Sequence, residues 1–235
     1  SFDVDGIDAA HKLAILSAIA FGHHVDFENV HVEGVRHVSP QDITFAEELG
    51  YRIKLLGIAE ETPEGVQQRV HPCMVKADTP IGQVEDVFNA VVAEGSAVGT
   101  TLSYGRGAGA GPTASAVIAD VMDLAAGRRV PVFGLDSSKL SAARTAPISA
   151  LTGCYYPRLM VIDRPGVLAD VTAVFRDHGV SVEAMIQRAR NPEEVVPLVL
   201  TTHETSETAI RASFEELQKL DCVLEEPRQI RIEDF

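Results

Sequence analysis

The fold of this chain is read most directly from residues 165–179, PGVLADVTAVFRDHG, and from the segments on either side of them. Val167, Val171 and Val174 recur at helical spacing, so this stretch predicts a helix with one apolar face. The segments around it alternate as strand, helix, strand, strand, helix, strand; they are residues 155–162, 165–179, 180–189, 195–203, 206–220 and 221–232. This βαββαβ order predicts a small ferredoxin-like domain.

Residues 130–153 differ in character from the segments that follow them. They are rich in small residues, contain two prolines and show no sustained periodicity, which is typical of a linker. We therefore expect one domain at residues 1–129 and a second at residues 154–235.

The first of these domains is predicted to combine strands with helices. Residues 39–50 begin with Ser-Pro, have an acidic first turn and end in glycine, which indicates a helix. Three β-rich runs follow at residues 51–60, 65–75 and 90–104. Their apolar residues partly alternate, as in a sheet with one covered face. The predicted fold class is therefore α+β, a mixed β-sheet with flanking helices followed by a ferredoxin-like βαββαβ domain.

The composition narrows the possible partners of the chain. A net charge of −14 disfavours binding to nucleic acid or to an anionic membrane surface. The longest uncharged run is too short to span a bilayer, so no membrane anchor is expected.

The chain has three cysteines, which is an odd number, so we expect no disulfide framework. Neither the cysteines nor the histidines have metal-ligand spacing, so we expect no metal site. A reducing cytoplasm fits such a chain best.

Residues 8–22, DAAHKLAILSAIAFG, carry one charged pair in an otherwise apolar helix pattern. No charged residue occupies the ten positions after Lys12, and a helix this apolar is normally buried. Asp8 lies four residues before Lys12, so the two side chains share a helix face at the rim of an apolar surface. The apolar residues that follow on this face are Ile15, Leu16 and Ile19. The simpler alternative is a surface ion pair worth roughly 0.2–0.5 kcal/mol.

A glycine-rich segment at residues 104–115, YGRGAGAGPTAS, lies between a strand-like run and a helix-like run. That order is typical of a phosphate-binding turn. The acidic residue expected about 20 positions later is missing, and Gly127, Arg128 and Arg129 stand in that region instead. Two interpretations stay open: a nucleotide-binding turn, or a tight connection packed against another element.

Four segments together resemble the homoserine dehydrogenase family; they are residues 3–22, 39–60, 68–75 and 104–125. They follow the order that the family uses, across residues 2–127. The resemblance implies NAD(P)-dependent interconversion of L-homoserine and L-aspartate 4-semialdehyde, in threonine and methionine biosynthesis, by a homodimer or homotetramer. Because no GxGxxG turn follows an early strand, we expect the chain to be the carboxyl-terminal portion of a longer enzyme and to be inactive alone.

The same resemblance implies roles for particular residues. Lys12 corresponds to the proton donor of the family, and Asp8 corresponds to a residue that binds substrate and places the lysine. Asp3 corresponds to an acidic residue near the substrate amino group. Gly109 and Gly107 correspond to the loop that approaches the NAD or NADP cofactor. An ammonium group suits this reaction, because hydride delivery to an aldehyde carbon builds negative charge on the oxygen.

Residues 160–187, MVIDRPGVLADVTAVFRDHGVSVEAMIQ, resemble an ACT domain, a regulatory module of many enzymes of amino-acid biosynthesis. The resemblance implies that an amino-acid effector such as threonine binds where the first strand turns into the first helix, with backbone groups from the second strand of a partner subunit closing the site. The corresponding residues are Asp163, Gly166 and Leu168 in the turn, and Met185 and Ile186 on the facing strand. A domain that only dimerises is the alternative. For the whole chain, the alternatives are a non-enzymatic amino-acid-binding or oligomerisation module and a different dehydrogenase with an ACT domain.

Overall fold

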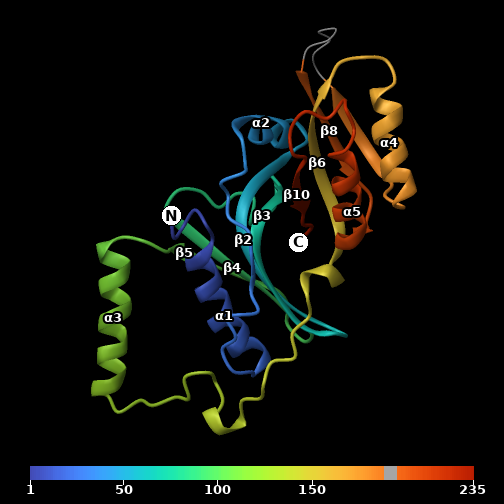
Figure 1. The fold of residues 1–235 in the computed structure, drawn as a ribbon. Helices are drawn as coiled ribbons and strands as arrows, with labels where there is room; N and C mark the ends of the chain where they lie inside the picture. The colour runs from blue at the N-terminus through green and yellow to red at the C-terminus, as the bar shows by residue number, and fades with distance from the viewer. Residues whose placement is uncertain (188–194) are drawn as a thin grey trace.

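The computed structural model describes residues 1–187 and 195–235, and Figure 1 shows the arrangement of its helices and strands. The helices are α1 (Ile7–Phe21), α2 (Pro40–Glu48), α3 (Ala110–Ala125), α4 (Val167–Asp177) and α5 (Glu207–Leu217). The strands are β1 (His31–Val32), β2 (Tyr51–Thr62), β3 (Gly65–Lys76), β4 (Phe88–Gly95), β5 (Gly99–Arg106), β6 (Thr152–Ile162), β7 (Val182–Gln187), β8 (Val195–Thr202), β9 (Thr205–Ser206) and β10 (Arg228–Ile232). Two short 3-10 turns, Ser137–Lys139 and Ile148–Ala150, lie between α3 and β6. The last two residues of the strand predicted at 180–189 lie outside the described residues.

Both halves of the chain contribute to one mixed sheet. Its strand order is β1-β3-β10-β6-β8-β7, and β2 pairs with β3 in antiparallel orientation. The last strand in the sequence, β10, runs parallel to β3, where Arg231 stands opposite Cys73. On its other edge β10 runs antiparallel to β6, where Arg231 stands opposite Tyr155. The expected mixed sheet with flanking helices is confirmed. The division at residues 130–153 stays a prediction, because β10 belongs to the sheet of both halves and β6 begins at Thr152.

The second half has the predicted order of β6, α4, β7, β8, α5 and β10, so the ferredoxin-like fold is confirmed. Helix α4 begins after Gly166, whose φ of 98° is a conformation that favours glycine. Val167, Val171 and Val174 are buried, as their helical spacing predicts. Helices α4 and α5 contact each other and cover the same sheet face (Figure 1). The large side chains of this core are Tyr155, Leu159, Phe175, Leu198, Leu200, Ile210 and Leu217.

Helix α2 joins the two halves on the opposite side of the sheet. It begins with a capping box, in which Asp42 N donates to Ser39 Oγ at 3.2 Å and Ser39 N donates to Asp42 Oδ2 at 2.8 Å. The apolar side of α2 packs into a core formed by β3 from the first half and by β6, β8 and β10 from the second. Its buried members are Phe45, Ala46, Met74, Tyr156, Val199 and Ile230.

Strands β4 and β5 form a separate two-stranded sheet, and α3 follows them. In Figure 1, α3 stands apart from the other helices. None of the side chains of α3, which the structure describes from end to end, is buried. Its large apolar residues Val117, Ile118, Val121, Met122 and Leu124 are 54–69% exposed. Such a surface is normally covered, so α3 is a candidate for contact with another part of a larger protein. Within the described residues, no helix has the length and apolar character needed to cross a membrane.

Candidate functional site

Helix α1 presents two different faces. It begins after Gly6 and ends at Gly22, both with positive φ, of 78° and 69°. The face of small and apolar residues that packs against β2 and β3 consists of Ala10, Leu13, Ala14 and Ala18. The other face leaves large apolar side chains 45–49% exposed; they are Ile15, Leu16 and Ile19. The chain therefore supports α1 on one side only.

Asp8 and Lys12 lie beside this exposed apolar face. Lys12 Nζ donates to Asp8 Oδ2 at 2.6 Å, and the two side chains are 66% (Lys12) and 40% (Asp8) exposed. The pairing that the four-residue spacing predicts is therefore present. A surface ion pair of this kind contributes little to stability, so its position next to an uncovered apolar stripe is the more informative observation. The catalytic roles of both residues stay predictions.

The loop of residues 1–6, here called the amino-terminal loop, carries Asp3 and leads directly into α1. Asp3 is exposed, and its carbonyl accepts from Gly6 N at 3.0 Å. Asp5 forms an ion pair with Arg36, and the hydrogen bond from Arg36 holds the pKa of Asp5 below its usual value. Val35 N donates to Val4 O at 2.9 Å. The segment that follows β1 therefore holds the loop that carries Asp3.

The glycine-rich connection joins β5 to α3, and its glycines differ in what surrounds them. A Cβ at Gly107 would lie 1.8 Å from Nδ2 of the exposed Asn89 side chain, which would have to move to admit it. Gly109 has a φ of 117°, and the nearest neighbour of an added Cβ would be Pro112 at 3.6 Å. Within residues 1–187 and 195–235, no hydrogen bond or ion pair links either glycine to Asp3, Asp8 or Lys12. Contact of Gly107 and Gly109 with a cofactor stays a prediction.

The turn between β6 and α4 contains the residues predicted to bind an effector. Asp163 Oδ1 accepts from Gln187 Nε2 at 3.3 Å, so the turn and strand β7 are brought together. Leu168 and Met185 are 38% and 45% exposed. Ile186 instead packs against the core beneath α2, because neighbouring residues of a strand point to opposite faces. The predicted role of these residues in effector binding is not tested by this geometry.

A buried charge cluster that the sequence did not reveal lies where the two halves meet. Arg231 is 2% exposed and donates to two carboxylates. Its Nη1 and Nη2 contact the two oxygens of Glu33 at 2.9 and 3.0 Å, and its Nη2 and Nε contact the two oxygens of Glu207 at 2.6 and 3.0 Å. Tyr155 Oη also donates to Glu207, at 2.9 Å. Burial would raise the pKa of Glu33, but the hydrogen bonds from His31 and Arg231 outweigh it and hold that pKa well below its usual value.

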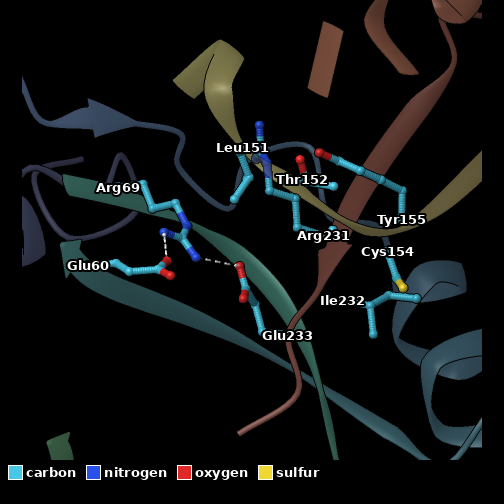
Figure 2. A pocket seen from close by; sticks show the side chains of 10 residues that line it. Glu60, Arg69, Leu151, Thr152, Cys154, Tyr155, Arg231, Ile232 and Glu233 are labelled. Carbon is cyan, nitrogen blue, oxygen red and sulfur yellow. Dashed lines mark hydrogen bonds and ion pairs between the residues drawn. The ribbon is translucent and has the colours of Figure 1, made fainter. Parts of the chain in front are cut away.

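A cavity of about 190 Å³ opens beside this cluster. It is lined by Glu60, Arg69, Leu151, Thr152, Gly153, Cys154, Tyr155, Arg231, Ile232 and Glu233. Figure 2 shows Arg69 between Glu60 and Glu233, to which it donates at 3.3 Å each. A second hollow lies between α2 and β2. Among the described residues, Asp3, Asp8 and Lys12 line neither of these two cavities.

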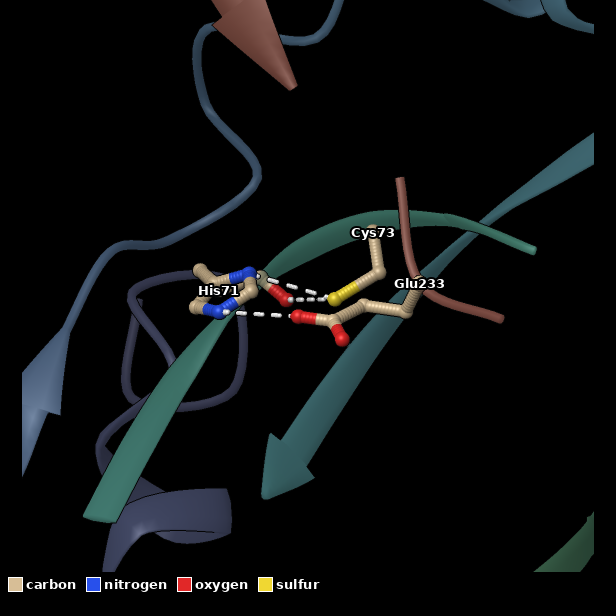
Figure 3. A group of neighbouring side chains, drawn as sticks. All are labelled: His71, Cys73 and Glu233. Carbon is tan, nitrogen blue, oxygen red and sulfur yellow. Dashed lines mark hydrogen bonds and ion pairs between the residues drawn. The ribbon is translucent and has the colours of Figure 1, made fainter. Parts of the chain in front are cut away.

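Three possible metal ligands meet on the same face of the sheet, although their spacing in the sequence predicted no metal site. Figure 3 shows His71, Cys73 and Glu233, whose ligand atoms lie within 4.8 Å of one another. Cys73 Sγ is 3.1 Å from Nδ1 of His71, and burial raises the pKa of the Cys73 thiol. Glu233 already accepts from Arg69. A protonated thiol and two neighbouring guanidinium groups fit a metal ion poorly, so we interpret the group as a hydrogen-bonded cluster.

His71 makes the stability of this cluster depend on pH. Burial, aided by the charge of Arg231, lowers the pKa of His71 to about 3 from the ordinary value of 6.5. Above pH 6.5 the residue is neutral in both folded and unfolded states and has no effect. Below pH 6.5 the unfolded chain binds the extra proton, so His71 lowers the free energy of unfolding by about 1.4 kcal/mol per pH unit until pH reaches about 3.

We therefore expect the His71→Gln variant to lose less stability between pH 7 and pH 5 than the unmodified protein. Glutamine has a similar size and keeps a hydrogen-bonding side chain, but it does not titrate. Denaturant unfolding at the two pH values measures the difference. The control is His203→Gln, at an exposed histidine, which should leave the pH dependence unchanged. Equal acid sensitivity of His71→Gln and the unmodified protein would contradict the prediction.

Comparison with known proteins shows the family to which the chain belongs. The homoserine dehydrogenase family model matches residues 1–122, more than half of the chain. The chain belongs to the homoserine dehydrogenase family. The ACT domain model matches residues 158–222. Both resemblances predicted from the sequence are thereby confirmed at the level of the family.

Several homoserine dehydrogenases are similar over the whole chain. That of Neisseria gonorrhoeae is 39% identical, over 100% of this chain and 55% of its own length. That of Pseudomonas aeruginosa is 41% identical, over 100% of this chain and 56% of its own length. The crystal structure of a homoserine dehydrogenase from Thiobacillus denitrificans has 44% identity and a TM-score of 0.90, over 99% of this chain and 54% of that one. The chain thus spans about half the length of the relatives that it matches.

The charge cluster lies at the junction of the homoserine dehydrogenase region and the ACT region. Glu33 belongs to the first region, while Glu207 and Arg231 follow β6 in the second half. Glu33 and Arg231 are separated by 198 positions in the sequence, so no periodicity or spacing could have paired them. The available signal was the position of Arg231 between two isoleucines in a strand-like run, and a buried arginine requires a carboxylate partner.

Proposed function

We propose that this chain is the substrate-binding and catalytic part of an NAD(P)-dependent homoserine dehydrogenase, joined to an ACT regulatory part. The whole enzyme interconverts L-homoserine and L-aspartate 4-semialdehyde in threonine and methionine biosynthesis. The proposal is carried by the Asp8–Lys12 pair on the uncovered face of α1, with its distance of 2.6 Å. Both residues lie within the region that the homoserine dehydrogenase family model matches.

In this proposal Lys12 supplies the proton. When the semialdehyde is reduced, negative charge develops on its carbonyl oxygen, and a neighbouring ammonium stabilises that charge and donates a proton to it. Asp8 accepts a hydrogen bond from Lys12 Nζ and so restrains the ammonium on the helix face. Asp3, which is exposed one turn before α1, is free to accept from the substrate amino group. The exposed apolar stripe beside the pair excludes water once it is covered.

NAD or NADP supplies the hydride when it is bound. Gly109 suits a position beside such a cofactor, because it has a positive φ and an added Cβ would have its nearest contact at 3.6 Å. Contact of Gly107 with the cofactor is part of the same proposal, and the side chain of Asn89 lies beside this glycine. We assign the remaining cofactor contacts to a dinucleotide-binding part outside this sequence.

The proposal also accounts for the uncovered surfaces of α1 and α3. Their apolar side chains are 45–69% exposed in the chain by itself. The matched relatives are nearly twice as long as the chain, so each has a further part that could cover such surfaces. We therefore propose that the chain alone is inactive and that the enzyme is a homodimer or homotetramer. The cysteines are free, which is consistent with the cytoplasmic location in the same proposal.

An activity assay tests this function directly. The whole protein that carries this chain is compared with the chain alone, by following NADPH oxidation in the presence of L-aspartate 4-semialdehyde. We expect turnover by the whole protein and none by the chain. If the whole protein does not reduce the semialdehyde but is stabilised by threonine, it is an amino-acid-binding module instead. Turnover with another aldehyde or keto acid alone would indicate a different dehydrogenase.

The ACT part is proposed to bind an amino acid such as threonine at the turn that contains Asp163, Gly166 and Leu168, with backbone groups of Met185 and Ile186 on strand β7 of a second subunit closing the site. The hydrogen bond between Asp163 and Gln187 is consistent with the proposal, because it fixes the turn beside the strand of its own chain. Leu168 and Met185 remain exposed enough to contact a ligand or a second subunit.

We expect threonine to raise the melting temperature of the unmodified protein, and Asp163→Ala to abolish most of that increase. At a threonine concentration of about 100 times Kd, binding stabilises the folded state by about 2.7 kcal/mol. Thermal unfolding with and without threonine measures the effect. Asp177→Ala, at the exposed end of α4, is the control and should respond as the unmodified protein does. If threonine and related amino acids have no effect on the unmodified protein, the domain only dimerises.

A further inference from the structure

Arg231 is one of the charged residues through which the second half of the chain contacts the first. It lies on β10, the strand inserted between β3 and β6. Its guanidinium makes two hydrogen bonds to Glu33 and two to Glu207, at 2.6 to 3.0 Å. Glu207 is the first residue of α5 and is fully buried. Two bidentate contacts fix a guanidinium in both position and orientation, which a single contact does not.

On the other side, Glu33 begins a short segment that holds the amino-terminal loop. Glu33 N donates to Val70 O at 2.7 Å, which ties the segment to β3. Gly34 is packed so closely that a Cβ there would lie 2.4 Å from the carbonyl oxygen of Val4. Next to it, Val35 N donates to that same oxygen. Residues 33–36 therefore form a continuous support for the backbone of the loop.

The amino-terminal loop is held by α1 and by residues 33–36. Toward α1, Ile7 N donates to Phe2 O at 3.1 Å, and the Phe2 ring contacts the ring of His11 edge-to-face, with 5.6 Å between centroids. Toward residues 33–36, the side-chain attachment is the ion pair between Asp5 and Arg36. A shift of Glu33 would thus be transmitted to the backbone of the loop that carries Asp3 and leads into Asp8.

We propose that Glu33 and Arg231 are positioning residues for the reaction, and that the last strand of the ACT part holds the substrate-binding loop in place through them. The inference rests on the proposed function and adds a specific connection to it. Neither residue touches the substrate. Their effect is on the position of Asp3 and Asp8, so it should be seen in the affinity for the amino-acid substrate. A low pKa of Glu33, caused by hydrogen bonds that outweigh its burial, is consistent with a carboxylate that stays charged and paired.

If Arg231 only stabilised the fold, its loss would lower stability without changing substrate affinity. A second buried ion pair in the chain serves as the control that distinguishes this structural role from the positioning role. Arg158 on β6 contacts Asp42 of α2, with Nε to Oδ1 at 2.6 Å and Nη2 to Oδ2 at 3.3 Å. Like Arg231, Arg158 is buried and joins the second half of the chain to the first. Asp42 lies in α2, six positions after Arg36, and among the described residues it makes no hydrogen bond to the amino-terminal loop.

The experiment compares Arg231→Met with Arg158→Met in the whole enzyme. Both variants should lower the melting temperature, because each removes a buried guanidinium from the carboxylates that it contacts. In Arg231→Met, Glu207 keeps Arg211 and Tyr155 as partners and Glu33 keeps His31. Arg231→Met should also raise KM for L-homoserine about tenfold or more, since a small displacement of a substrate-positioning group is costly, while KM for the cofactor stays within about twofold. Arg158→Met should leave both KM values unchanged. Arg231→Lys keeps the charge but not the bidentate geometry, so its KM for L-homoserine should lie between that of Arg231→Met and that of the unmodified enzyme.

Glu33→Gln keeps the proposal testable if Arg231→Met does not fold, because it preserves the shape of the side chain. It should also raise KM for L-homoserine and leave KM for the cofactor unchanged. An unchanged KM for L-homoserine in Arg231→Met and Glu33→Gln, or an equal increase in Arg158→Met, would overturn the positioning role. Lack of homoserine dehydrogenase activity in the unmodified protein would instead overturn the proposed function.

Discussion

Replacing Lys12 by alanine in the whole enzyme is expected to lower the turnover number by about 10²- to 10⁴-fold, the usual contribution of a positioned acid or base. The reason is that alanine removes the ammonium that neutralises the developing charge on the carbonyl oxygen. Lys12 is 66% exposed and forms one ion pair, so its removal should cost little stability. Steady-state kinetics with L-aspartate 4-semialdehyde and NADPH measure the effect, and KM for NADPH should change little.

A matched control is available for this experiment. Lys76 forms a comparable exposed ion pair with Asp234, at 2.9 Å, and the proposal gives it no part in the reaction. Lys76→Ala should therefore leave the turnover number within about twofold of the unmodified enzyme. The turnover number of Asp8→Asn should lie between those of Lys12→Ala and Lys76→Ala, because the lysine remains but loses its charged partner. A turnover number of Lys12→Ala equal to that of Lys76→Ala would remove Lys12 from the mechanism.

Replacing Asp42 by alanine should give the largest loss of stability, about 3–5 kcal/mol. Asp42 is 1% exposed and lies where α2 meets the shared sheet. It accepts from Arg158 through both oxygens, from Tyr156 Oη at 3.1 Å and from Ser39 N at 2.8 Å. Alanine removes all of these contacts and leaves the guanidinium of Arg158 buried without its partner.

Ser39→Ala separates the contribution of the helix cap from that of the buried ion pair. The serine hydroxyl accepts from Asp42 N at 3.2 Å and donates to Asp42 Oδ2 at 2.7 Å, while the contact between Asp42 and Arg158 does not involve it. Its loss should therefore cost about 1 kcal/mol. Denaturant unfolding of the two variants gives the comparison. A loss for Asp42→Ala no larger than that for Ser39→Ala would show that the contact with Arg158 contributes nothing to stability.

The local elements of this fold could be predicted from the sequence because their signals are local. The valines of α4 repeat at helical spacing, and Ser39 with Asp42 marks the start of α2. The place of β10 could not be predicted, because pairing with β3 and β6 depends on contacts between residues 70 or more positions apart. For the same reason, the sequence predicted two domains in succession but not the sheet to which both contribute.

In the candidate site, too, the contacts between residues close in the sequence could be predicted and those between distant residues could not. The spacing of Asp8 and Lys12 on one helix predicted their ion pair, and the structure contains it. The partners of Arg231 could not be predicted, because Glu33, Glu207 and Arg231 meet only after the sheet has formed. Contact of Gly107 with a cofactor stays a prediction, and in the structure the side chain of Asn89 lies beside this glycine. A glycine pattern alone does not distinguish close packing from ligand contact, since both exclude a Cβ.

In the proposed reaction, the ammonium of Lys12 delivers the proton to the substrate oxygen. Chemical rescue of the Lys12→Ala enzyme tests this role, by adding small primary amines and measuring semialdehyde reduction at constant pH. We expect the rate to increase with amine concentration and to depend on the pKa of the added amine, because the amine replaces the missing acid. We expect no increase for the unmodified enzyme or for Lys76→Ala. Normal turnover of Lys12→Ala without any added amine would show that Lys12 is not the proton donor.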